Sequence, residues 1–139
     1  MSVLGDEWVI VVKLHYLNQL KPVDGVIDAT DYSSVNHLLT IADFMITDYS
    51  SLLFDYSVLE KPALLFQYDR ASYENDRSFM FRMEDYVNDE DIIFTEDELY
   101  AKMRSVESMK NNMSAIKEEF YPHQHERATA DLVKDLALD

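Results

Sequence analysis

The first half of the chain alternates short runs of consecutive apolar residues with longer segments in which apolar residues recur every three or four positions. Consecutive apolar residues are typical of strands buried on both faces of a parallel sheet, and the longer spacing is typical of amphipathic helices. The run from Trp8 to Val12 is the clearest example of such a buried strand. Further strands are expected at 26–29, 44–47, 63–66 and 92–94.

Helical segments are expected between these strands. Two are predicted over 33–42 and 50–59, because each opens on serines and then carries apolar residues on one face. A third follows Thr95, which has the capping-box spacing to Glu98. Residues 69–90 show no clear period, and two more helices are expected around 108–120 and 126–137.

The alternation of strands with helix-sized segments predicts right-handed strand–helix–strand crossovers. We therefore expect an α/β fold with a three-layer, Rossmann-like, doubly wound parallel sheet. A chain of 139 residues has room for one such domain, which we take to span residues 1–139. An apolar share of 47% is enough to build its core.

The amino-acid composition excludes several classes of function. Lys and Arg number 12 against 27 Asp and Glu, and the resulting formal charge of −15 argues against binding to nucleic acid or to anionic membranes. The absence of cysteine excludes disulfides, thiolate zinc sites and cysteine nucleophiles. The longest apolar run is too short to cross a bilayer and no signal-like start is visible, so a soluble, cytoplasmic protein is expected.

The segment from Ala42 to Ser51 carries the densest chemical signal. A buried strand ends in a short polar turn, and this turn also begins the next helix. Ligands of open α/β sheets bind at the carboxyl ends of strands, and free amides with the hydroxyls of Ser50 and Ser51 would suit a phosphate there. Local chemistry alone also allows a purely structural interpretation, in which Ser50 caps the helix and Asp48 supports the turn.

The run from Ala42 to Asp69, ADFMITDYSSLLFDYSVLEKPALLFQYD, resembles the C-terminal half of the CDP-glycerol glycerophosphotransferase family, the teichoic acid polymerases and primases. The family pattern is matched without a gap by Asp43, Thr47 to Ser51, Phe54-Asp55, Pro62 and Tyr68-Asp69.

Weaker similarity flanks this run. Lys13-Leu14-His15 matches a strand end of the family, with Tyr16 in place of the usual proline. Arg77-Ser78-Phe79 is similar to an Arg-Gly-aromatic motif of the family, with Ser78 in place of glycine. Ala128-Thr129 is weakly similar to the end of an Asp-Gly-x-Ala-Thr segment that lies late in the family pattern.

The resemblance implies the donor-binding, C-terminal domain of a GT-B type glycosyltransferase. His15 would be catalytic and would face the donor phosphates with Ser50 and Ser51, Asp48 would order the loop, and Arg77 would offset pyrophosphate charge. The substrate-binding residues implied are Thr47, Asp48, Ser50, Ser51 and Arg77.

The implied reaction transfers glycerol phosphate or ribitol phosphate from a CDP-alcohol to a polyol-phosphate polymer or lipid-linked acceptor, with release of CMP. A second histidine motif of the family lies in an N-terminal half that these residues do not contain. We therefore expect the isolated chain to need that half as a partner and not to turn over. The parent enzyme is expected in the cytoplasm, with peripheral attachment to the inner face of the membrane left open.

No cofactor and no metal are expected. His123 and His125 form a His-x-His pair without an evident third ligand, and the acidic segment 84–98 lacks the spacing and central glycine of a calcium loop. The alternative function is a non-catalytic α/β interaction module that keeps the fold and has lost the chemistry. A receiver-like signalling domain fits poorly, because the first strand is followed by His15 rather than by a pair of acids.

Overall fold

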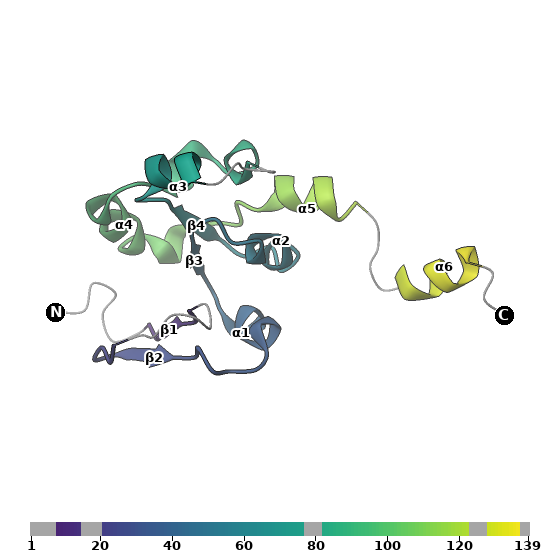
Figure 1. The fold of residues 1–139 in the computed structure, drawn as a ribbon, viewed down its shortest axis with the longest axis horizontal. Helices are drawn as coiled ribbons and strands as arrows, with labels where there is room; N and C mark the ends of the chain where they lie inside the picture. The colour runs from purple at the N-terminus through teal and green to yellow at the C-terminus, as the bar shows by residue number, and fades with distance from the viewer. Residues whose placement is uncertain (1–7, 15–20, 77–81, 123–127, 137–139) are drawn as a thin grey trace.

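The computed structural model describes residues 8–14, 21–76, 82–122 and 128–136. Within them, five strands form two sheets in which every pairing is parallel. One sheet pairs β1 with β2, and the other has the order β3-β4-β5 (Figure 1). The strands are β1 (Ile10–Val12), β2 (Val26–Asp28), β3 (Met45–Thr47), β4 (Ala63–Phe66) and β5 (Ile92–Ile93).

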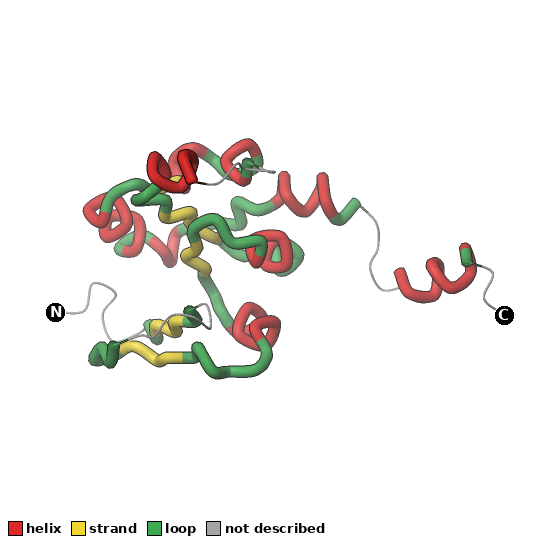
Figure 2. The backbone as a smooth tube through the Cα atoms, viewed as in Figure 1, coloured by secondary structure: helices red, strands yellow, loops and turns green. Residues whose placement is uncertain are grey.

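Helices connect the strands and follow them (Figure 2). Those predicted over 33–42 and 50–59 are confirmed as α1 and α2, whereas α3 lies in the segment without a clear period. The helix expected around 108–120 is shorter, because α5 begins only at Ser114. The helices are α1 (Val35–Ile41), α2 (Leu52–Ser57), α3 (Arg70–Asp76), α4 (Glu96–Met103), α5 (Ser114–Phe120) and α6 (Ala128–Asp135), with 3-10 turns at Met83–Asp85, Asp89–Asp91 and Val106–Ser108.

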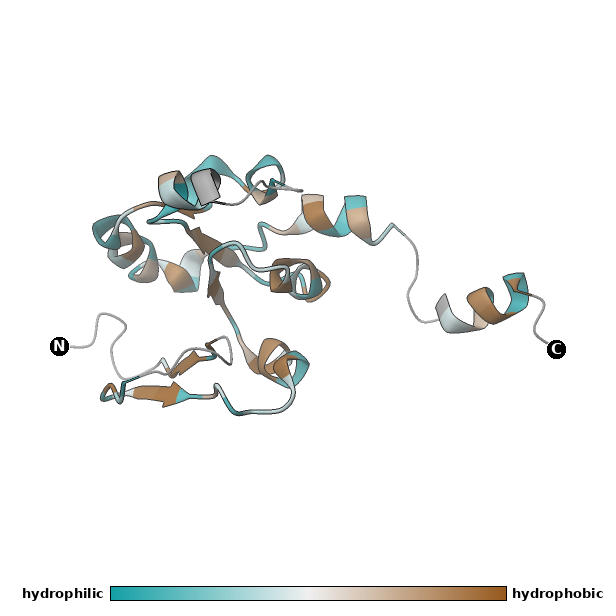
Figure 3. Cartoon of the chain, viewed as in Figure 1, coloured by the Kyte–Doolittle hydropathy of each residue, from teal (hydrophilic) through white to brown (hydrophobic). Residues whose placement is uncertain are grey.

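The hydrophobic core lies against the three-stranded sheet. Leu53 and Tyr56 of α2 and Ile116 of α5 are fully buried together with Leu65 of β4. Figure 3 shows the same distribution, with β3, β4 and α2 coloured as apolar. This packing fixes the position of α2 relative to the end of β3, where the predicted phosphate-binding turn lies.

The α/β class with parallel strands is confirmed, but one detail of the prediction is wrong. The strand at Trp8 to Val12 was expected to be buried on both faces, yet Val9 is 69% exposed and Val11 is also exposed. The physical reason is that β1 and β2 form a separate pair, and among the described elements no helix packs extensively on β1, so its faces remain uncovered.

Helix α6 lies apart from the rest of the described chain (Figure 1). Its apolar residues Leu132 and Val133 are exposed, as is Leu136, which follows it. Among the described residues, the helices are all too short or too polar to cross a membrane.

Candidate functional site

The candidate site is the loop of residues 48–51, which joins β3 to α2. Strand β3 ends at Thr47 and α2 begins at Leu52, so the loop starts at the carboxyl end of a parallel strand. This is the edge at which open α/β sheets bind their ligands. Thr47 itself is half-buried and pairs with Leu65 of β4, so it anchors the loop to the middle strand of the sheet.

The two serines of the loop differ in what their hydroxyls do. The Ser50 Oγ accepts a hydrogen bond of 3.3 Å from the backbone N–H of Leu52, and the Ser50 carbonyl accepts one of 3.2 Å from Leu53. Ser51 occupies the N-cap position, but its side chain makes no capping bond and the residue is exposed. The expectation that Ser50 is the N-cap is therefore not met: Ser50 supports the first turn of α2 through its bond from Leu52, and Ser51 holds the N-cap position and is exposed.

Asp48 is held against its own loop. Its Oδ1 accepts a hydrogen bond of 2.7 Å from the backbone N–H of Tyr49, and its side chain remains exposed. This contact fixes the carboxylate beside the backbone at the point where the chain leaves β3. A carboxylate at this position disfavours a bound anion by charge.

Tyr49 connects three elements. Its hydroxyl donates a hydrogen bond of 3.1 Å to Asp69 Oδ1, which lies just after β4. Its ring stacks on Tyr73 of α3 with centroids 3.8 Å apart and an angle of 16° between the planes. Burial raises the pKa of the Tyr49 hydroxyl, and the hydrogen bond to Asp69 adds to this rise. The phenol therefore remains a hydrogen-bond donor throughout the physiological range of pH.

Tyr49, Asp69 and Tyr73 were not among the predicted site residues. Tyr49 and Asp69 belong to the ungapped family pattern, and their spacing of 20 residues is visible in the sequence. The spacing alone does not predict that the Tyr49 and Asp69 side chains are in contact, because the contact depends on the pairing of β3 with β4.

Two basic residues that follow described strands, Arg70 and Lys13, have partners of their own. Arg70, at the start of α3, forms an ion pair of 3.5 Å with Glu84 and lies 5.9 Å over the ring of Phe94. Lys13, at the end of β1, donates hydrogen bonds through its Nζ to three backbone carbonyls that follow β2. Lys13 therefore ties β1 to the segment after β2.

The structure brings together four of the six predicted site residues, Thr47, Asp48, Ser50 and Ser51, in one strand end and its loop. The other two, His15 and Arg77, lie outside the described residues, as do His123 and His125. Among the residues that the structure describes, no three His, Asp or Glu side chains are grouped to hold a metal ion.

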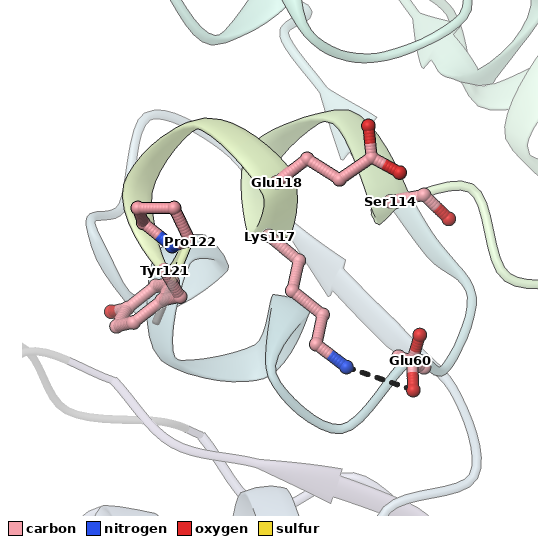
Figure 4. A pocket seen from close by; sticks show the side chains of 6 residues that line it. All are labelled: Glu60, Ser114, Lys117, Glu118, Tyr121 and Pro122. Atoms are coloured by element: carbon pink, nitrogen blue, oxygen red, sulfur yellow. Dashed lines mark ion pairs between the residues drawn. The ribbon is translucent and has the colours of Figure 1, made fainter. Parts of the chain in front are cut away.

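A shallow hollow lies elsewhere, between α5 and the chain that follows α2 (Figure 4). Glu60 and Glu118 contribute carboxylates to it, and Lys117 is paired with Glu60 at 2.9 Å. Because its single lysine is paired and its other charges are negative, this hollow does not suit a phosphate and lies away from the carboxyl end of β3.

Comparison with known proteins finds a family model and several relatives that match this sequence. A family model described as CDP-glycerol:poly(glycerophosphate) glycerophosphotransferase matches residues 1–138. The teichoic acid poly(glycerol phosphate) polymerase of Staphylococcus epidermidis is 38% identical over 76 residues, which cover 51% of this chain and 10% of that protein. The ribitol-phosphate polymerase TarL of Staphylococcus aureus is 28% identical over 134 residues, which cover 92% of this chain and 24% of that protein.

Solved structures agree with this result. The wall teichoic acid polymerase TagF superposes with a TM-score of 0.70 at 29% identity, over 95% of this chain and 35% of the TagF chain. A histidine-to-asparagine variant of TagF soaked with CDPG gives a TM-score of 0.76 at 29% identity, over 96% of this chain and 36% of that one. The 139 residues thus span about a third of the TagF chain, and they belong to the CDP-glycerol:poly(glycerophosphate) glycerophosphotransferase family.

Proposed function

We propose that this domain binds the CDP-alcohol donor, CDP-glycerol or CDP-ribitol, of a teichoic acid glycerophosphotransferase. The observation that carries the proposal is the loop of residues 48–51, which leaves the carboxyl end of β3 with the Ser51 hydroxyl exposed. Two further facts support it: the domain belongs to the family, and a TagF variant of similar fold was soaked with CDPG.

In this proposal the domain contributes phosphate contacts rather than a complete active site. Ser50, Ser51 and His15 face the donor phosphates, and Arg77 offsets the pyrophosphate charge. An acceptor hydroxyl attacks the phosphorus that carries the polyol and gives up its proton to the solvent, the bond from that phosphorus to the bridging oxygen breaks, and CMP leaves with that oxygen. Hydrogen-bond donors and positive charge around phosphorus stabilise the charge that develops on the phosphoryl oxygens.

The acceptor side of the reaction is assigned to residues outside this chain. The chain spans about a third of TagF and between 10% and 24% of its curated relatives. Its formal charge of −15 would also repel a phosphate-rich acceptor. We therefore propose that the isolated domain binds donor weakly and does not catalyse transfer.

Calorimetric titration of the chain with CDP-glycerol, CDP-ribitol and CMP tests the proposal. Saturable binding of a CDP-alcohol is expected, and Ser51→Ala and His15→Ala should each weaken it several-fold. Ser33→Ala, an exposed serine in the loop before α1, is the matched control and should leave binding unchanged. Circular dichroism of each variant separates lost binding from lost folding.

The alternative is an interaction module that retains the fold without the chemistry. Ser78 in place of the family glycine favours it. A folded chain that binds none of the three nucleotides, in the presence of the remainder of its parent protein as well as alone, would favour this second function.

A further inference from the structure

Tyr49 is the residue of the 48–51 loop whose side chain hydrogen-bonds beyond the loop and the helix that follows it. In the described part of the chain, the hydrogen bonds of the other three loop residues stay within residues 48–54, because they join the loop to itself or to the first turn of α2. The Tyr49 hydroxyl instead donates to Asp69, and its ring lies on Tyr73. Both partners follow β4, so Tyr49 links the loop to the segment after the neighbouring strand.

The two partners of Tyr49 are held in a fixed relation to each other. The Asp69 carbonyl accepts hydrogen bonds of 2.9 Å and 3.0 Å from the backbone N–H groups of Ser72 and Tyr73. Asp69 and Tyr73 are therefore joined through the first turn of α3. The bond of 3.1 Å to Asp69 fixes the end of the Tyr49 side chain, and the stack on Tyr73 fixes the plane of its ring. Together they determine both torsions of the Tyr49 side chain.

The turn that carries Asp69 is itself anchored. Arg70, the next residue, forms an ion pair of 3.5 Å with Glu84 and lies over the ring of Phe94, which follows β5. The Glu84 side chain is only 9% exposed, and an ion pair on a buried carboxylate is screened less than one at the surface. Consecutive residues of the turn after β4 thus contact the loop after β3 and the chain after β5.

The backbone on both sides of the loop is fixed as well. Before the loop, Thr47 pairs with Leu65 of β4. After the loop, Leu53 and Tyr56 hold α2 in the core. A short segment between two fixed ends has few free torsions, so a side chain anchored inside it determines where the neighbouring residues point. Tyr49 has that place, directly before the two serines of the loop.

Charge and proton count argue against a direct contact of this pair with the donor. The Asp69 carboxylate would repel a phosphate. A phenol has one proton to donate, and the structure places that proton in the bond to Asp69. Tyr49 and Asp69 therefore suit the support of a phosphate-binding loop better than the binding of phosphate itself.

The geometry points to Tyr49 as a positioning residue, whose hydrogen bond to Asp69 holds the 48–51 loop in the conformation that presents its two serines to the donor phosphates. This role rests on the proposed function of the loop as the site of the CDP-alcohol donor. It assigns the order of the loop to a side chain that does not touch the donor. A loop that is ordered before the ligand arrives binds it more tightly, because less conformational freedom is lost on binding.

Tyr49→Phe tests this role, because it removes the hydroxyl and keeps the ring for the stack on Tyr73. The variant is expected to bind CDP-glycerol about 3- to 10-fold more weakly than the parent chain in calorimetric titration. Its melting temperature should fall by no more than about 5 °C, so binding is measured on folded protein. Tyr68→Phe is the matched control and should bind as the parent does, because Tyr68 is 70% exposed.

Substitutions at Asp69 separate the hydrogen bond from the charge. Asp69→Asn and Asp69→Ala remove the same charge, but only asparagine keeps an oxygen that can accept the phenol proton. Asp69→Asn should bind CDP-glycerol at least as tightly as the parent chain, and Asp69→Ala about 3- to 10-fold more weakly than Asp69→Asn. Adding Tyr49→Phe to Asp69→Ala should cost nothing further, because both remove the same bond. Equal binding by Asp69→Asn and Asp69→Ala would overturn the proposal.

Nuclear magnetic resonance measures the order of the loop without any donor. The backbone order parameters of Ser50 and Ser51 should be about 0.85 in the parent chain and should fall towards about 0.6 in Tyr49→Phe and in Asp69→Ala. Leu53, which is fully buried, is the internal control and should keep its value. Serine order parameters that stay unchanged in both variants would overturn the positioning role.

The two measurements distinguish failure of the positioning role from failure of the proposed function. If the parent chain binds CDP-glycerol and Tyr49→Phe binds it equally well, the positioning role is wrong and the donor-binding function stands. If the parent chain binds no CDP-alcohol while the serine order parameters fall in both variants, the donor-binding function is contradicted and the hold of Tyr49 on the loop is retained.

Discussion

The side-chain amide of Asn112 hydrogen-bonds to both backbone polar groups of Ala63, 49 residues earlier in the chain. The Ala63 N–H donates to Asn112 Oδ1 at 3.0 Å, and Asn112 Nδ2 donates to the Ala63 carbonyl at 2.8 Å. Ala63 begins β4, whereas β5 reaches β4 only at Leu65. The Asn112 side chain thus supplies the hydrogen bonds that a strand neighbour would make at the start of β4.

Asn112→Ala is expected to lower the free energy of unfolding by about 2–4 kcal/mol, because it leaves buried backbone groups of Ala63 without partners. Urea denaturation at neutral pH measures the change. Asn36→Ala, on the exposed side of α1, is the matched control and should stay within about 0.5 kcal/mol of the parent chain. A loss as small as that of the control would show that water replaces the amide at no cost.

A second prediction concerns the charge next to this contact. Asp91 is 4% exposed and accepts hydrogen bonds from Lys102 Nζ at 3.1 Å and from Asn112 Nδ2 at 2.8 Å. Lys102→Met removes the only cation that the structure pairs with this carboxylate among the described residues. The expected loss is about 1–2 kcal/mol, below the value for a fully buried pair, because Lys102 is partly exposed and Asn112 remains.

Thermal or urea unfolding measures this loss, with Lys110→Met as the control for removing an exposed lysine. Raising the salt concentration should change the difference little, because a buried pair is screened less than a surface pair. A Lys102→Met variant as stable as the Lys110→Met variant would contradict the proposed role of the ion pair.

The strands and most helices could be predicted because their signals are local. Periodicity located β3 and α2, and the spacing of Thr95 and Glu98 located the start of α4. Helix α3 was missed, because aromatic and charged residues without a period surround it. The position of the candidate loop followed from β3 and α2 together.

Contacts that depend on strand pairing could not be read from the chain. The bond from Tyr49 to Asp69 needs β3 beside β4, and the contact of Asn112 with Ala63 needs both β4 and the chain before α5 in place. The division into two sheets was also not visible, because Val9 and Val11 have the apolar character of a buried strand whether or not a neighbour covers them.

The start of α4 gives a prediction in acid. The Thr95 Oγ1 accepts a bond of 3.3 Å from the Glu98 N–H, and Glu98 Oε2 accepts bonds of 3.0 Å from the N–H groups of Phe94 and Thr95. The bond from Phe94, followed by those from Thr95, lowers the pKa of Glu98 below its ordinary value of 4.5. Its stabilising effect is therefore present above about pH 4.5 and is lost as the pH falls through the lower, folded-state value.

Glu98→Gln should flatten the fall in unfolding free energy between about pH 5 and pH 3, measured by urea titration at each pH. Glu96→Gln, in the same turn of α4, is the control for the loss of one negative charge. Thr95→Ala should cost about 1 kcal/mol at neutral pH, the usual value of an N-cap. Equal acid slopes in Glu98→Gln and the parent chain would contradict the assignment.

The last prediction concerns alkali. Tyr56 is fully buried in the core, and burial, with a smaller contribution from Asp43, raises the pKa of its hydroxyl from 10.0 to about 12. In the unfolded chain the same hydroxyl ionises near its ordinary value. The neutral phenol thus favours the folded state fully below about pH 10, and this contribution is lost as the pH rises toward 12.

Tyr56→Phe should therefore reduce the loss of unfolding free energy between pH 10 and pH 12 by on the order of 1–2 kcal/mol. At neutral pH its cost should be below about 1 kcal/mol, because the bond from the hydroxyl to the Ala42 carbonyl is long, at 3.4 Å. Tyr68→Phe is the control, since Tyr68 is 70% exposed, and should follow the parent chain at every pH. If Tyr56→Phe loses stability in alkali as steeply as Tyr68→Phe, ionisation of the buried phenol does not contribute to the alkaline unfolding of this domain.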